Sequence, residues 1–179
     1  DEMHYARIED GRPIGQLLRE AVTSAIQTLL LIGGFIMTFS VITHLISYIG
    51  LTKIIAYTLS FILMFLGIPT DLSVPLFNGF FEMTLGSQLI SSVSAIPLIY
   101  QLTLVSVIIA FNGFSIHAQV ASMLGRTNIR YLPYFVARLM HALLAGLMTI
   151  LIFKPLQPYL HHLPSSIPTT VSTMSATTL

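Results

Sequence analysis

The stretch SAIQTLLLIGGFIMTFSVITHLISYI, residues 24–49, decides the fold class because it contains no Asp, Glu, Lys or Arg. A helix needs about 20 consecutive apolar residues to cross the hydrocarbon core of a bilayer, and this stretch supplies them. The shortage of charge continues along the chain, where Asp71 and Glu82 are the only charged residues between Lys53 and Arg126. The sequence therefore predicts an all-α integral membrane protein.

Overall composition narrows the class of partner. Of the 179 residues, 54% are hydrophobic and 8% are charged, whereas about 25% are charged in ordinary soluble domains. The formal net charge of +1 gives no basic surface for a nucleic acid. The chain contains no cysteine, which excludes disulfides and thiolate chemistry within it. The lipid bilayer, and not a nucleic acid, is the expected partner.

The amino-terminal part is predicted to lead into the membrane domain. Residues 1–12 are a polar lead, and Pro13 suits the first turn of a helix because its missing N–H needs no partner there. Over residues 14–25 apolar side chains recur at helical spacing, which predicts an amphipathic helix on the membrane surface. A helix that continues directly into the first span is the alternative. Within that span, Gly33 and Gly34 are expected to let another helix approach closely.

Two short apolar segments follow, residues 54–68 and 76–93. Between them GIPTDLSVP, residues 67–75, contains one Gly and two Pro that break helices. Irregular backbone at membrane depth survives only where protein or water satisfies its polar groups, so the two segments predict a re-entrant helical hairpin. Two tilted full crossings are the alternative.

The carboxyl-terminal half is predicted to contain a broken helix and a last span. Residues 97–124 are helix-capable but interrupted near Asn112, and residues 131–153 form the last span. Residues 155–179, rich in Pro, Ser and Thr, predict a disordered tail. The membrane domain is accordingly expected at 13–154.

The basic residues predict an orientation. If residues 54–93 contribute an even number of crossings, Lys53 and Lys154 lie on one side of the membrane and five arginines on the other. The rule that short cytoplasmic loops carry excess Lys and Arg then places the amino end in the cytoplasm and the carboxyl tail outside it. The five are Arg7, Arg12, Arg19, Arg126 and Arg130.

Glu82 is the first candidate site residue, in GFFEMTLGSQ, residues 79–88. A carboxylate at mid-membrane is costly unless it is paired, protonated or hydrated, so its default interpretation is functional. Thr84, Ser87 and Gln88 lie within two helical turns of it, and neighbouring glycines can open the backbone. These four side chains are predicted to bind a substrate or a coupling ion. A structural Glu bonded to a neighbouring helix is the alternative.

The second candidate region is FNGFSIHAQVAS, residues 111–122. On a helix Asn112, Ser115 and Gln119 stand at i, i+3 and i+7, so they form one polar stripe that Ser122 extends. A helix broken at Asn112 would turn free backbone groups and a positive N-terminal end toward a bound ligand. The alternative is that the stripe only holds membrane helices together.

His117 and Arg138 are two further candidates. His117 points away from the stripe, so its part in binding is left open. Arg138 lies in the first turns of the last span, where it either snorkels to the interface or reaches a substrate carboxylate.

Motifs for catalysis are missing from the sequence. It contains no HExxH, GxSxG or GxxxxGK[ST] motif and no pair of intramembrane acids at helical spacing, so neither an enzyme nor a metal site is expected. The prediction is a transporter that binds a small polar or anionic solute and works by alternating access. A non-transporting membrane scaffold or receptor subunit is the alternative.

Three stretches carry a resemblance to a known family. LLLIGGFIMTFSVI, GFFEMTLGS and IIAFNGFSIHAQVASML resemble the carboxyl-terminal half of the bacterial sporulation integral membrane protein family called YlbJ or SpoVV, which carries the nucleoside-recognition Gate domain. The match covers essentially residues 13–154, and the combination of GFxEMTxG with SxHAQ is its most specific part.

The resemblance implies a fold and a function. The fold would be one repeat of an inverted-repeat architecture like that of concentrative nucleoside transporters, with the other repeat half as a partner and homo-oligomers allowed. The function would be transport of dipicolinic acid from the mother cell into the forespore, in the outer forespore membrane. Coupling to a proton or a sodium ion at Glu82 is a separate hypothesis, and no other cofactor is expected. Dipicolinate is a dianion, so an ionised Glu82 would repel it, and Ser115, Gln119 or Arg138 would meet its carboxylates.

Overall fold

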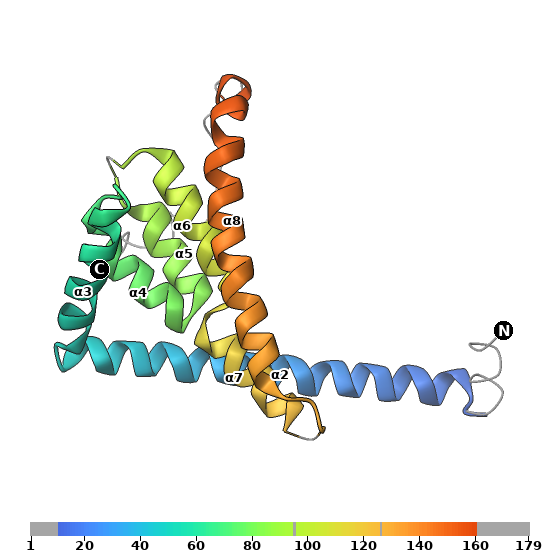
Figure 1. Ribbon diagram of the computed structural model, residues 1–179. Helices are drawn as coiled ribbons and strands as arrows, with labels where there is room; N and C mark the ends of the chain where they lie inside the picture. The colour runs from blue at the N-terminus through green and yellow to red at the C-terminus, as the bar shows by residue number, and fades with distance from the viewer. Residues whose placement is uncertain (1–10, 95, 126, 161–179) are drawn as a thin grey trace, which may run out of the picture.

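The computed structural model describes residues 11–160 except 95 and 126, and these residues form α-helices and one short 3-10 helix. In Figure 1, α3 to α6 gather on one side of the long α8, while α2 runs crosswise below them. The elements are α2 (Ile14–Tyr48), α3 (Leu51–Phe65), η1 (Thr70–Leu72), α4 (Ser73–Phe81), α5 (Met83–Ser92), α6 (Leu98–Phe111), α7 (Gly113–Leu124) and α8 (Tyr131–Leu160).

Three stretches of helix are long and apolar enough to cross a membrane. They are Ile14–Tyr48, Leu98–Leu124, which joins α6 and α7, and Tyr131–Pro158. Their surfaces are covered by exposed Leu, Ile, Val and Met side chains, as expected for helices whose solvent is lipid rather than water. The prediction of an all-α, multi-pass integral membrane protein is therefore confirmed.

The helix α2 is continuous from Ile14 to Tyr48, so no separate surface helix precedes the first span. Of the two possibilities for residues 14–25, the structure has the helix that continues into the span. Within the described residues, a Cβ placed on Gly33 or Gly34 would meet no atom within 4 Å. The expectation of a close helix contact at this glycine pair was therefore wrong for this part of the chain.

A helical hairpin is present, but its turn is at Glu82 and not in the segment 67–75. The backbone of Glu82 is extended, with φ −141° and ψ 113°, which ends α4 and begins α5. The two arms then pack so closely that a Cβ on Gly86 would overlap the backbone of Gly79. The expected arms at 54–68 and 76–93 are corrected accordingly: α3 is a separate helix, and both arms lie within residues 73–92.

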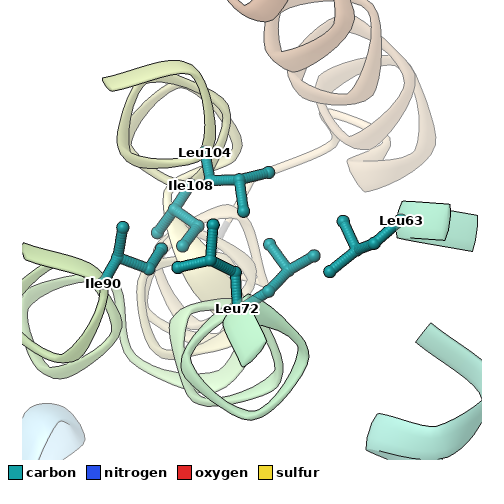
Figure 2. Close-up of a cluster of buried hydrophobic side chains, with 6 residues drawn as sticks. Leu63, Leu72, Ile90, Leu104 and Ile108 are labelled. Carbon is teal, nitrogen blue, oxygen red and sulfur yellow. The ribbon is translucent and has the colours of Figure 1, made fainter. Parts of the chain in front are cut away.

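The hairpin is held in place by one apolar cluster. Figure 2 shows Ile90 from α5 meeting Leu72, at the base of α4, together with Leu104 and Ile108 from α6. Leu63 from α3 closes the cluster from the other side. Leu72 and Ile90 lie at the two ends of the hairpin remote from the turn, so the cluster holds the base of the hairpin together.

The second helix break is where the sequence places it. Asn112 ends α6 and begins α7 with a left-handed φ of 78°, and Gly113 follows with φ 66°. Asn and Gly are the two residues that tolerate this conformation best, which explains why the helix breaks here.

The last helix is longer than the sequence predicts. α8 packs along α6 and continues through Pro155 and Pro158 to Leu160, so residues 155–160 are helical and not part of a disordered tail. The remainder of the predicted tail, 161–179, and the polar lead up to residue 10 lie outside the described residues.

Candidate functional site

Glu82 caps the second arm of the hairpin. Its side chain is 3% exposed, and its carboxylate accepts hydrogen bonds from the backbone N–H groups of Thr84 (3.1 Å) and Leu85 (2.7 Å). The hydroxyl of Thr84 also donates to it. The first turn of a helix has unpaired N–H groups and a partial positive charge, so an ionised carboxylate is stable there. The buried acid is thus explained by an arrangement within its own hairpin.

The other candidates on α5 divide between two faces. Thr84 and Gln88 are one turn apart and exposed on the outside of the hairpin. Ser87 faces inward, and its hydroxyl oxygen is buried without a hydrogen-bond partner within the described residues. The four predicted residues are therefore close in sequence, but they do not converge on a single point.

The two helix breaks meet each other. A Cβ placed on Gly113 would lie 3.2 Å from the carbonyl oxygen of Gly79 and 3.2 Å from the backbone nitrogen of Met83, and it would lie 3.3 Å from the carbonyl oxygen of Phe81. The N-terminus of α7 is thus seated against the turn of the α4–α5 hairpin. Irregular backbone of two separate elements is thus brought together in one place: the break at Asn112, which the sequence predicts, and the hairpin turn at Glu82, which it places elsewhere.

Asn112 and Arg138 form a bridge from this break to α8. With its amide oriented to satisfy both groups, Asn112 donates through nitrogen to the carbonyl of Ile109 (2.7 Å) and accepts through oxygen from Nε (3.2 Å) and Nη2 (3.1 Å) of Arg138. The guanidinium also lies over the ring of Tyr134, with Cζ 5.5 Å from its centroid. Since α7 begins after it, Asn112 does not continue the predicted polar stripe, and that part of the expectation is corrected.

His117 satisfies the carbonyl group that the break exposes. Its Nε2 donates to the carbonyl of Phe111 (2.9 Å), and its Nδ1 accepts from the hydroxyl of Tyr131 (2.6 Å). The last carbonyls of a helix have no intrahelical partner, so His117 replaces the bonds that α6 would have made by continuing. With both ring nitrogens paired and 3% exposure, His117 acts as a brace of the broken helix.

This role predicts a loss of stability in His117→Phe. The phenyl ring keeps the packing against neighbouring aromatics but leaves the Phe111 carbonyl and the Tyr131 hydroxyl without partners. Burying such groups costs about 1–3 kcal/mol, so thermal unfolding in detergent should shift to lower temperature. Tyr131→Phe, which removes one bond, should cost less. A His117→Phe protein as stable as the parent would contradict the role.

Ser115 and Gln119 have polar atoms that nothing in the described chain satisfies. Ser115 is 0% exposed and Gln119 is 6% exposed, and neither Oγ of Ser115 nor Nε2 of Gln119 has a hydrogen-bond partner there. The two side chains lie one turn apart on one face of α7. Asn112, at the N-terminus of this helix, makes no side-chain capping bond. Buried polar groups without a hydrogen bond are rare in native structures, so these two atoms are expected to bind a ligand, a water molecule or another part of the protein.

Apart from Gln88, which is exposed on α5, the predicted site residues fall into two sets. Glu82, Thr84, Asn112, His117 and Arg138 hold the breaks in shape, whereas Ser87, Ser115 and Gln119 offer unpaired atoms. The sequence analysis did not predict Tyr131 and Tyr134. The two tyrosines are three residues apart at the start of α8, and this spacing, which puts them on one face of a helix, could have indicated them. No three His, Asp or Glu side chains gather as a metal site in the described ranges.

A curated protein matches most of the chain. The sporulation integral membrane protein YlbJ of Bacillus subtilis (strain 168) is 43% identical to the chain over 159 residues, which are 89% of this chain and 39% of that protein. The chain thus spans about two fifths of the length of the curated relative that it matches. No family model matches the chain, and no solved structure matches it significantly. The Gate domain and the nucleoside-transporter-like repeat stay predictions. At this identity, over nearly its whole length, the chain belongs to the YlbJ family of sporulation integral membrane proteins.

Proposed function

We propose that the chain is one part of a longer transporter that moves a small anionic solute across a membrane by alternating access. The observation that carries the proposal is the meeting of two helix breaks, where Gly113 touches the turn at residues 79–83. Broken helices at membrane depth are typical of transporter sites because their free ends can face a solute. The lipid bilayer and the other repeat half are the proposed partners, and no enzymatic reaction is included.

Apart from Glu82, whose carboxylate is bound by the first turn of α5, the charged and polar groups around the breaks favour an anion. Arg138 lies beside Asn112, near the middle of the stretch Leu98–Leu124, and no carboxylate of the described residues pairs with it. The N-terminus of α7 adds a partial positive charge and unpaired N–H groups. Ser115, buried in its first turn, adds an unpartnered hydroxyl. Together these groups suit the carboxylates of dipicolinic acid, the substrate that the family resemblance implies.

Glu82 is the proposed coupling residue, with a proton or sodium ion as the coupling partner. Its carboxylate accepts three hydrogen bonds at the start of α5, directly beside the turn that contacts Gly113. Protonation would remove the negative charge and at least one acceptor from this cap. The hairpin turn would loosen, which gives a physical route from an ion to the position of the broken helix.

A scaffold or receptor subunit is the second candidate. It is favoured by the hydrogen bonds of Glu82, Asn112 and His117, all of which have partners within the chain. The two functions differ in the effect of a conservative change. A scaffold should lose assembly, whereas a transporter should lose flux while it stays folded.

The test is uptake of labelled dipicolinate into proteoliposomes that contain the full-length protein, with a labelled nucleoside as the control solute. We expect dipicolinate uptake above that of empty liposomes and no comparable uptake of the nucleoside. Glu82→Gln keeps an acceptor oxygen for the cap, so it should fold, but uptake should fall and lose its dependence on pH. Unchanged rate and pH dependence would exclude the coupling role of Glu82. No uptake of dipicolinate by folded native protein would refute transport and favour the scaffold.

A further inference from the structure

A row of polar side chains on α2 has no part in the site described above. Over the first half of this membrane helix, Gln16, Glu20, Thr23 and Gln27 recur at i, i+4, i+7 and i+11 and therefore share one face. Ser24 lies at the edge of this face, and Thr28 follows one turn later on the side turned toward α7. The opposite side carries exposed apolar residues such as Leu29, which is 67% exposed. An apolar helix with one polar face indicates contact with something other than lipid along that face.

The polar face of α2 opens onto a groove between α2 and α7. The groove has a volume of about 430 Å³ and is lined by Ser24, Gln27, Thr28, Leu31, Ser122 and Met123. A water molecule occupies about 30 Å³ in the liquid, so the groove has room for more than ten of them. Its lining is therefore both polar enough and large enough to be hydrated.

The polar groups that line the groove do not bond to one another. Thr28 donates to the carbonyl of Ser24 at 2.8 Å. The side chains of Ser24, Gln27 and Ser122 make no hydrogen bond within residues 11–160. If the polar side chains of the groove served only to join α2 to α7, hydrogen bonds between the two helices would be expected. If lipid filled the groove, these groups would lie unpaired in hydrocarbon, at a cost of several kcal/mol in total.

The groove lies on the same face of α7 as the unpaired polar side chains near the helix breaks. Ser122 is three residues from Gln119 and seven from Ser115, so all three lie on the same face of α7. Gln119 is 6% exposed and its Nε2 has no partner in the described chain. One face of α7 thus carries polar groups from the groove to the break at Asn112.

We propose that the groove between α2 and α7 is a hydrated vestibule through which water and a small polar solute reach the helix breaks. Passage of a solute through the groove rests on the proposed transport function, whereas hydration of the groove does not depend on it. Ser24, Gln27, Thr28 and Ser122 form its wall, and Gln119 and Ser115 continue it inward.

Cysteine labelling tests this directly, because the chain contributes no thiol of its own. Thr28→Cys and Ser122→Cys would be made singly in a cysteine-free full-length protein in membranes and treated with a charged, membrane-impermeant methanethiosulfonate. Leu29→Cys, next to Thr28 in sequence but on the opposite, exposed apolar side of α2, is the matched control. A thiol reacts as its thiolate, which forms in water and not in lipid, so both groove positions should react at least about tenfold faster than the control.

Uptake of labelled dipicolinate by the labelled proteins completes the test. Fast labelling at both groove positions, with uptake blocked after labelling, would support the vestibule as the solute route. Labelling no faster than at Leu29→Cys would overturn the hydrated groove, even if the protein transports dipicolinate. Fast labelling without any effect on uptake would overturn the solute route. If the native protein takes up no dipicolinate, labelling alone still decides whether the groove holds water, so failure of the proposed function is recognised separately.

Discussion

Gly86→Ala should prevent the α4–α5 hairpin from closing and should be among the most destabilising single changes in the chain. The added Cβ would overlap the Cα and N atoms of Gly79, which are backbone atoms that cannot rotate away. Overpacking within a core costs about 1–3 kcal/mol when side chains can adjust, and a clash between two backbones should exceed this range. The separated arms would also pull Ile90 out of its contact with Leu72.

The measurement is the temperature at which the peak of folded protein is lost during size-exclusion chromatography in detergent. Gly33→Ala is the matched control, because it is also a glycine inside a helix but has no atom of the described chain within 4 Å of the new Cβ. Alanine is favoured over glycine in a helix by up to about 1 kcal/mol, so this control should be neutral or slightly stabilising. Equal stability of Gly86→Ala and Gly33→Ala would show that the two arms of the hairpin are not in close contact at Gly79 and Gly86.

The hairpin shows why its turn was misplaced from sequence. Gly67, Pro69 and Pro75 are strong local signals for a chain reversal, whereas Glu82 is surrounded by residues that permit a helix. Two interactions end α4 at Glu82. Gly79 and Gly86 bring the two arms into contact, and the Glu82 carboxylate accepts hydrogen bonds from the backbone N–H groups of Thr84 and Leu85. Close packing of the two arms depends on how they approach in three dimensions. The glycines are visible in the sequence, but their contact with each other is not.

The second break was predictable because its cause is local. Asn112 and Gly113 are adjacent residues that both accept positive φ, and a single pair of this kind is enough to interrupt a helix. The braces around it were not predictable. Arg138 and Tyr131 reach the break only because α8 packs along α6, and this contact joins residues far apart in the chain.

Arg138→Gln should abolish most transport while it leaves the fold intact. The guanidinium bonds to Asn112 and also donates to Nδ1 of His141 at 3.3 Å, but no carboxylate in the described part of the chain neutralises it. A positive charge within a membrane span costs about 3 kcal/mol on insertion scales, so its removal should not destabilise the protein. The amide of the introduced glutamine can still donate to the oxygen of Asn112, which preserves the shape of the break.

The loss should be specific to the anion. Hydrogen bonds to charged groups contribute about 1.5–3 kcal/mol, so dipicolinate uptake at a low solute concentration should fall by at least about tenfold. Arg138→Lys keeps the charge but not the two-pronged geometry that suits a carboxylate, and it should retain part of the uptake. Lys154→Gln, which removes a cation near the other end of α8, is the control and should transport like the parent. If Arg138→Gln folds and takes up dipicolinate at the parental rate, Arg138 only braces Asn112, and the positive charge that attracts the solute must be supplied by the N-terminus of α7 or by the other part of the protein.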